Sequence, residues 1–204
     1  FSNHYLMQLL TEAGLPPGVI NFLPGSGGTV ADTVIADPRL GGVHFTGSTG
    51  VFNGIWSTVG KNIASYRQYP RLVGETGGKD FIVAHRSCDA QALAVALVRG
   101  AFEYQGQKCS AASRAYVPKS MWNDVRDRMA AMLADVKMGD VRDFSNFVGA
   151  VIDARSYAKL KGAIDAAKSS KDAKVVLGGA CDDRVGYFVQ PTVIEALDPK
   201  YDTM

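Results

Sequence analysis

A cysteine and a glutamate are the two side chains of this chain best suited to covalent chemistry on a carbonyl group. Cys109 lies in the segment GQKCS (residues 106–110), and Glu75 lies in the segment GETGGK (residues 74–79). A thiolate is a nucleophile, and a carboxylate can act as a general base. Each residue lies in a segment that begins with a glycine, so the backbone there can turn sharply and come close to a ligand. The interval between them has room for a strand and a helix, and we expect the two side chains to meet in the folded protein.

The residues around Cys109 favour a catalytic role over a structural one. A lone cysteine is more often a small buried hydrophobe, and a glutamate in a loop is most often a surface residue. Lys108, however, places a positive charge beside the thiol, and Gly106 and Ser110 leave room for a substrate against the sulfur. No histidine lies nearby in the sequence to activate the thiol.

The segment Gly47-Ser48-Thr49-Gly50 follows a predicted strand and opens a predicted helix. Free backbone N–H groups and the positive end of a helix dipole could hold a pyrophosphate at this place, with the Ser48 hydroxyl as a further donor. The same four residues also make a good turn and helix cap. The three-glycine dinucleotide fingerprint and the phosphate-loop lysine are both absent.

Hydrophobic periodicity predicts alternating helices and strands in the first part of the chain. Leu6, Leu9 and Leu10 share one helical face, and Gly14 ends that helix. We then expect a buried strand, a helix, a second strand and a further helix, at residues 19–23, 30–36, 42–46 and 51–62. Strand, glycine turn and helix in this order are typical of a dinucleotide-binding fold.

A domain boundary is predicted near Gly77 and Gly78, after a strand that leads into the Glu75 loop. Beyond it we expect a strand at 80–84, a helix from Asp89 to the Gly106 loop, and a strand at 115–117. A helix capped by Ser120 follows, and its buried face is Val125, Met129, Met132, Leu133 and Val136. The last expected elements are a helix at 153–168, with Tyr157, Leu160 and Ile164 inward, and strands at 174–177 and 187–190. This pattern indicates a second α/β domain.

Composition excludes several classes of function. The chain has 204 residues and a net charge of +2, from 22 basic and 20 acidic residues without a basic stripe, so nucleic acid is not an expected partner. No apolar run reaches the length of a membrane span. The three cysteines, Cys88, Cys109 and Cys181, are too widely spaced for a metal site, and their odd number fits a reducing interior. Cys88 and Cys181 are interpreted as bystanders.

Four motifs in order resemble those of the aldehyde dehydrogenase superfamily: LPPGVIN at 15–21, FTGSTG at 45–50, ETGGK at 75–79 and GQKC at 106–109. The resemblance covers essentially the whole chain. The segments YPRLVGE (69–75), AFEYQGQKCSA (101–111) and GYFV (186–189) resemble most the branch that oxidises glutamate γ-semialdehyde, which forms from Δ1-pyrroline-5-carboxylate. Two positions depart from the common pattern: Phe52 stands where most members have Gly, and Thr76 stands where they have Leu.

The resemblance implies an α/β fold in which residues 1–77 are the C-terminal part of a Rossmann-like NAD-binding domain. Residues 78–204 would belong to an α/β catalytic domain with a parallel sheet. NAD is the implied cofactor, with Gly47, Ser48, Thr49, Gly50, Val51 and Thr76 as its contacts. No metal is implied.

The resemblance further implies that Cys109 forms a thiohemiacetal and then a thioester with the aldehyde, and that Glu75 activates the water that releases glutamate. Lys108 and Ser110 would help to hold the substrate carboxylate. The full-length protein is expected to be a homo-oligomer in a bacterial cytoplasm or a mitochondrial matrix.

Further family segments that hold cofactor and substrate are expected before Phe1 and after Met204. We therefore expect residues 1–204 to be an internal piece that does not turn over substrate alone. Two alternatives stay open: an NAD(P)-dependent dehydrogenase of another aldehyde, such as succinate semialdehyde, and a truncated module in which Cys109 is inert.

Overall fold

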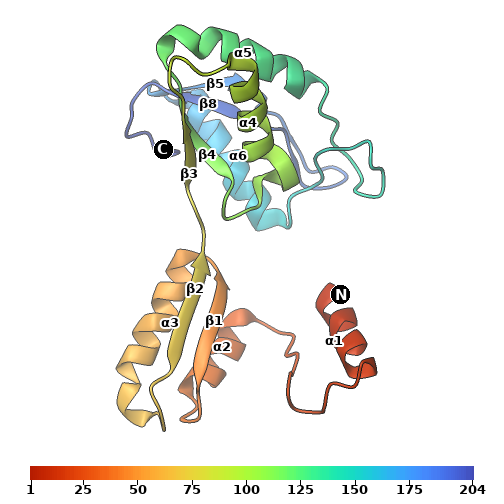
Figure 1. The fold of residues 1–204 in the computed structure, drawn as a ribbon, viewed down its shortest axis with the longest axis vertical. Coiled ribbons are helices and arrows are strands. Elements are labelled where there is room, and N and C mark those ends of the chain that lie inside the picture. The colour runs from red at the N-terminus through yellow and green to blue at the C-terminus, as the bar shows by residue number, and fades with distance from the viewer. The chain divides into compact units, whose positions relative to one another are not determined.

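The computed structural model describes residues 1–204, which form two compact units, Phe1–Thr76 (unit 1) and Gly77–Met204 (unit 2). Both units combine helices with parallel strand pairs, so the chain has the expected α/β class (Figure 1). None of the helices combines the length and the apolar character needed to cross a membrane.

Unit 1 is built around two parallel strands, β1 (Gly42–Gly47) and β2 (Arg71–Thr76). The helices α2 (Gly27–Ala36) and α3 (Thr49–Lys61) pack with this strand pair, and a short 3-10 helix (Ile63–Ser65) follows α3 (Figure 1). Their shared core is the buried cluster Ile35, Leu40, Ile55 and Val59, against which Val43, Phe45 and Leu72 from the strands pack. Burial of this apolar surface holds the carboxyl ends of the two strands at one edge.

Two expectations for unit 1 need correction or refinement. Residues 19–23 do not form a strand, because no other segment pairs with them and Val19, Ile20 and Leu23 are exposed. An isolated strand leaves its backbone groups unpaired, so an apolar run alone does not make one. The helix α1 (Ser2–Glu12) forms as predicted, but none of its residues is buried.

Unit 2 contains three α-helices, α4 (Ala90–Phe102), α5 (Lys119–Ala134) and α6 (Ala154–Ser169), and a short 3-10 helix (Glu103–Gly106) follows α4. The strands β3 (Asp80–Val83) and β4 (Ala112–Tyr116) are parallel, as predicted. Two further pairs are antiparallel: β5 (Ala173–Leu177) with β8 (Val193–Ala196), and β6 (Cys181–Asp182) with β7 (Phe188–Val189). These antiparallel pairs, and the strands β6 and β8, were not expected from the sequence.

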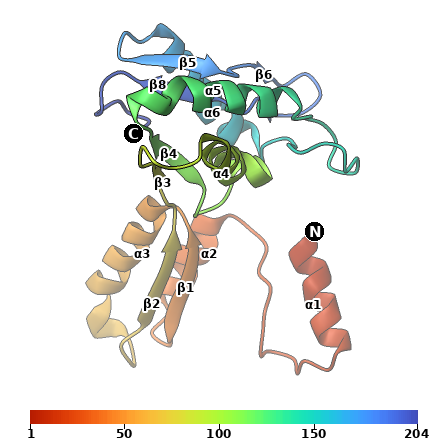
Figure 2. The same ribbon diagram turned by 45° about the horizontal axis from the view of Figure 1, so that its top comes forward.

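The core of unit 2 lies between α4 and α5, which pack side by side (Figures 1 and 2). Leu93, Ala94, Leu97 and Val98 of α4 meet Val125 and Met129 of α5, and Val125 is completely buried. Asp89 caps α4 by accepting a hydrogen bond from the Ala92 N–H at 2.7 Å. The cap stabilises the N-terminal end of α4, and the core packing holds the helix whose C-terminal end leads into the Cys109 segment.

Two side-chain expectations for unit 2 are wrong. Ser120 does not cap α5, because that helix begins at Lys119 with Pro118 in the capping position, and Ser120 lies inside its first turn. Leu160 of α6 is exposed, whereas Tyr157 and Ile164 on the same helix are buried as predicted.

Candidate active site

The predicted cofactor residues of unit 1 lie together at the carboxyl edge of β1 and β2. The strand register pairs Thr46 with Glu75 and Gly47 with Thr76, so the two strands end side by side. The turn from β1 into α3 begins at that same edge. Ligands of open parallel sheets bind outside the carboxyl ends of the strands. The sequence placed Glu75 in a loop; it lies instead near the end of β2, where it is exposed.

Ser48 caps α3 and leaves the first helical N–H groups free. Its Oγ accepts a hydrogen bond from the Val51 N–H at 3.3 Å, and its carbonyl accepts from the Phe52 N–H at 3.1 Å. The N–H groups of Thr49 and Gly50 have no partner in unit 1. These donors and the helix dipole make the turn suited to an anionic group such as a pyrophosphate.

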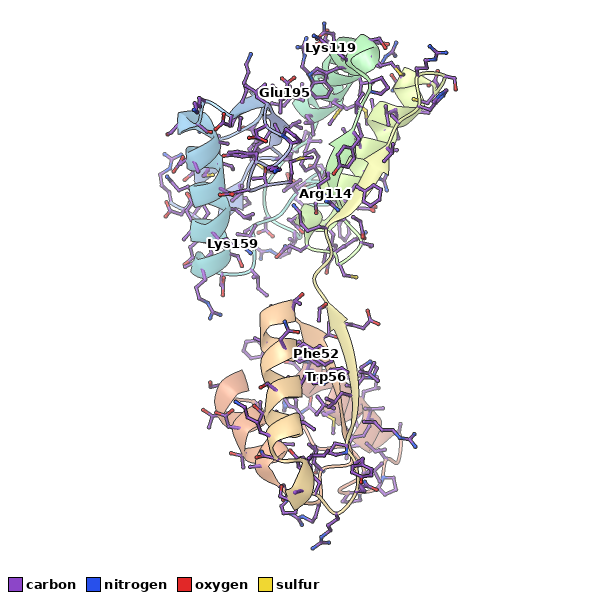
Figure 3. The ribbon with its side chains drawn as sticks, turned by 90° about the vertical axis from the view of Figure 1, so that its left-hand side faces the viewer. Phe52, Trp56, Arg114, Lys119, Lys159 and Glu195 are labelled. Carbon is purple, nitrogen blue, oxygen red and sulfur yellow. The ribbon has the colours of Figure 1, made fainter.

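Phe52, one of the two departures from the common motif, has a defined packing role. Its ring stacks on that of Phe45, with the ring centroids 5.9 Å apart. It also meets the Trp56 ring edge-on, with the centroids 5.8 Å apart; Figure 3 labels both Phe52 and Trp56 on α3. The ring also covers Gly74, where an added Cβ would overlap it. Phe52 therefore fills space that β2 leaves open beside Glu75, and this ties the start of α3 to the end of the strand.

Cys109 lies in a turn that follows the end of α4. The Ala111 N–H donates to the Lys108 carbonyl at 3.3 Å, which closes a tight turn around Cys109 and Ser110. The thiol is exposed. The N–H of Cys109 donates to no group within unit 2, so it is free to donate to an oxygen atom held against the sulfur.

Gly78 lies against the backbone of Cys109. A Cβ added at Gly78 would overlap the carbonyl oxygen of Cys109 and come within 3.2 Å of its carbonyl carbon. At the neighbouring Gly77 an added Cβ would meet nothing within 4 Å. Only a glycine at position 78 therefore allows the two segments this close approach.

Lys108 is part of an ion-pair network at the end of α4. Glu103 binds the Lys108 ammonium at 3.0 Å and the Arg99 guanidinium at 2.7 Å. Hydrogen bonds from Lys108 and then from Arg99 lower the pKa of Glu103 below its usual value. The network leaves a net charge of +1 near Cys109. Sequence reasoning missed Glu103, although its four-residue spacing from Arg99 is the usual signal of a helical ion pair.

Lys79 and Arg114 hold backbone carbonyl groups. The Lys79 ammonium donates to the Thr203 carbonyl at 2.8 Å, and burial lowers the pKa of this lysine. Arg114, which is labelled in Figure 3, donates through Nε to the Lys79 carbonyl at 3.0 Å. Its guanidinium carbon lies 5.4 Å from the centroid of the Phe81 ring. Both cations therefore fix the start of β3, directly after the Gly77-Gly78 segment.

The predicted site residues thus form two groups. Gly47 to Val51, Glu75 and Thr76 come together in unit 1, and Lys108, Cys109 and Ser110 share one turn in unit 2. No group of three or more His, Cys, Asp and Glu side chains is arranged to hold a metal ion.

Comparison with known proteins gives a consistent match over the whole chain. The sequence profile described as "Aldehyde dehydrogenase family" matches residues 1–204. Among curated proteins, the mitochondrial delta-1-pyrroline-5-carboxylate dehydrogenase of Dictyostelium discoideum is 51% identical and the human one 43% identical, each over 100% of this chain. The chain spans only 37% and 36% of the lengths of these relatives.

Solved structures of similar proteins carry related names. The Mycobacterium tuberculosis delta-pyrroline-5-carboxylate dehydrogenase bound with NAD superposes with a TM-score of 0.92 at 53% identity, over 98% of this chain and 37% of that one. The Thermus 1-pyrroline-5-carboxylate dehydrogenase with bound NAD gives a TM-score of 0.86 at 34% identity, over 93% of this chain and 36% of that one.

Proposed function

Since this chain belongs to the aldehyde dehydrogenase family, we propose that its protein oxidises L-glutamate γ-semialdehyde, formed from Δ1-pyrroline-5-carboxylate, to L-glutamate with NAD. The observation that carries this proposal is the exposed Cys109 thiol, which lies in a tight turn beside its own free N–H. The names of the relatives, at 51% and 43% identity, support the choice of substrate.

Residues 1–77 are proposed as part of the NAD-binding domain, and Gly47, Ser48, Thr49, Gly50, Val51 and Thr76 as its cofactor contacts. The free N–H groups of Thr49 and Gly50 fit a pyrophosphate, and Thr76 reaches the same edge of the sheet. When bound, NAD would supply the hydride acceptor of the reaction.

Residues 78–204 are proposed as part of the catalytic domain, with Cys109 as nucleophile. Its thiolate attacks the aldehyde carbon, and a C–S bond forms while the carbonyl π bond opens to an oxyanion. The Cys109 N–H stabilises that oxygen. The thiohemiacetal then loses a hydride from carbon and becomes a thioester on Cys109.

Glu75 is proposed as the general base of the second half of the reaction. Its carboxylate takes a proton from water, whose oxygen attacks the thioester carbon. The C–S bond breaks with its electron pair on sulfur, which restores the Cys109 thiolate. The product leaves as glutamate carboxylate, and its acid proton and the proton held by Glu75 pass to solvent. The exposed position of Glu75 at the end of β2 gives water access to this carboxylate.

Lys108 and Ser110 are proposed to hold the α-carboxylate of the substrate. They flank Cys109 in one turn, and a cation with a hydroxyl group matches a carboxylate. The Lys108 Nζ lies 3.0 Å from Oε2 of Glu103, at the end of α4. This ion pair holds the Lys108 ammonium near the end of the helix.

The protein is proposed to act on a small aldehyde, as a homo-oligomer when full length, in a bacterial cytoplasm or a mitochondrial matrix. Neither a nucleic acid nor a membrane is part of this function. Mitochondrial relatives support the second compartment.

NADH production by the full-length protein tests the function, with Δ1-pyrroline-5-carboxylate and succinate semialdehyde compared by kcat/KM. A clear preference for the first substrate is expected, and a preference for the second would replace the proposed aldehyde. Cys109→Ala should abolish NADH production, whereas the matched variants Cys88→Ala and Cys181→Ala should keep it.

Glu75→Gln separates the two half-reactions. We expect one rapid NADH per active site, followed by a stalled acyl-enzyme, because the hydride step does not need the base. A Glu75→Gln enzyme with wild-type steady-state turnover would remove Glu75 from this role. Equal alkylation of all three cysteines, without protection by the aldehyde, would favour an inert module.

A further inference from the structure

The backbone just before the nucleophile adopts an unusual left-handed turn. Tyr104 has a φ of 58°, Gln105 has 57° and Gly106 has 65°. Glycine tolerates this region, but a side chain with a Cβ is strained there. Two successive non-glycine residues in this conformation need surrounding contacts that hold them in place.

Gly106 accounts for one of these contacts. An added Cβ at Gly106 would lie 2.7 Å from the Ala101 carbonyl oxygen in the last turn of α4. The turn therefore folds back tightly on the helix end, and the Gln107 N–H closes it by donating to the Tyr104 carbonyl at 3.1 Å. Cys109 follows two residues later.

The Gln105 side chain supplies the other contact. Its terminal amide faces the Gly149 N–H and the Tyr104 carbonyl. We assign the amide in the one orientation that satisfies both groups: the oxygen accepts from the Gly149 N–H at 2.6 Å, and the nitrogen donates to the Tyr104 carbonyl at 2.8 Å. A Cβ at Gly149 would collide with this side chain, so the two segments approach closely. Gln105 also helps to line an apolar cavity of about 300 Å³ together with Val148 and Val151. One amide thus connects the strained turn to the 148–151 segment of unit 2.

The Cys109 sulfur is free and exposed, so the conformation of the backbone turn largely sets where it lies. We propose that Gln105 is a positioning residue for this nucleophile: its amide, braced on Gly149, holds the left-handed turn that presents Cys109. The inference deepens the proposed function and depends on Cys109 being its nucleophile.

Gln105→Met in the full-length protein tests this role, since methionine keeps the length and apolar stem but lacks both hydrogen bonds. Tyr104→Asn is the matched control, because Tyr104 is 68% exposed and asparagine tolerates left-handed backbone. We measure kcat and KM for the aldehyde, the second-order rate of Cys109 alkylation by iodoacetamide, the number of reactive thiols and the melting temperature.

Gln105→Met is expected to lower kcat by about tenfold to hundredfold with KM changed less than threefold, because a displaced nucleophile slows the chemistry. The alkylation rate of Cys109 should change as well, while Tyr104→Asn should match the wild type in both readouts. A merely structural role would lower the number of reactive thiols and the melting temperature but leave the rate per active thiol unchanged. That result, or wild-type kcat in Gln105→Met, would overturn the proposal.

Alkylation separates this inference from the proposed function. It needs neither NAD nor aldehyde, so a changed alkylation rate in Gln105→Met supports the positioning role even where wild-type protein makes no NADH with Δ1-pyrroline-5-carboxylate. An absence of NADH production with Δ1-pyrroline-5-carboxylate would count against the proposed substrate and not against the role of Gln105.

Discussion

Replacing Gly78 with alanine should damage catalysis without touching any side chain that does chemistry. The added Cβ would overlap the carbonyl oxygen of Cys109 and lie 3.2 Å from its carbonyl carbon, where unstrained carbon atoms keep about 3.5–4.0 Å. The obstacle is backbone, so it cannot rotate away as a flexible side chain would. The segment around Cys109 must therefore move by a distance on the order of 1 Å.

A displacement of about 1 Å at a reacting group costs about 100-fold in rate. That loss corresponds to about 2.7 kcal/mol on the activation barrier. The same overlap should lower the free energy of unfolding by about 1–3 kcal/mol, the usual cost of overpacking. We therefore expect Gly78→Ala to reduce kcat/KM by about 100-fold in a protein that still folds.

Steady-state NADH production and a thermal melt measure both effects. Gly77→Ala is the matched control, because an added Cβ at the adjacent glycine meets nothing within 4 Å. We expect this control to keep kcat/KM within about threefold of wild type. A folded Gly78→Ala enzyme with the activity of Gly77→Ala would show that the close approach to Cys109 has no part in placing the thiol.

Three other perturbations have clear expected outcomes. Lys108→Met should raise the KM for glutamate semialdehyde about tenfold, because one charge-assisted contact with the substrate carboxylate is lost. The KM for propanal, which has no carboxylate, should not change, and steady-state kinetics with both substrates measure the two values. Val125→Ala, at a completely buried site, should lower the free energy of unfolding by about 2 kcal/mol, measured by urea denaturation. Val141→Ala, at an exposed site, should leave that free energy almost unchanged. Hydrogen bonds from Arg184 lower the pKa of Asp182 from 3.8 to about 2. As the pH falls, Asp182 takes up its proton at a higher pH in the unfolded state than in the folded state. The stabilisation from its ion pair is therefore complete above about pH 4 and is lost toward pH 2. Asp182→Asn should flatten the dependence of melting temperature on pH over this range at low salt.

Local sequence signals predicted the helices and the first parallel strands well. Asp89 and Asp153 cap α4 and α6 through their carboxylates, at 2.7 and 2.8 Å from the N–H groups of Ala92 and Ser156. These signals work because the cap and the apolar face lie within one or two turns of each other. The capping role predicted for Ser120 failed because Pro118 already occupies the capping position of α5.

Strands were predicted less well where the local pattern did not match the actual pairing. Residues 19–23 have the apolar pattern of a strand but no pairing segment, whereas β8 pairs with β5 from 16 or more residues away. Apolar patterns describe one segment and carry no information about its partner. The left-handed turn at Tyr104 and Gln105 was equally hidden, because neither residue type favours that backbone region.

The two groups of site residues are encoded in different ways, and this difference decides where substitutions should matter. In unit 1 the strand, turn and helix from Gly42 to Lys61 place their own free N–H groups, so a local motif suffices. In unit 2 the Cys109 carbonyl lies against Gly78, and the Gln105 amide of the preceding turn lies against Gly149; both glycines are distant in the sequence from the segments they contact. Substitutions of exposed side chains next to Cys109 should therefore affect substrate affinity, as at Lys108. Substitutions at the distant contacts should affect kcat, because they are expected to displace Cys109, the proposed nucleophile.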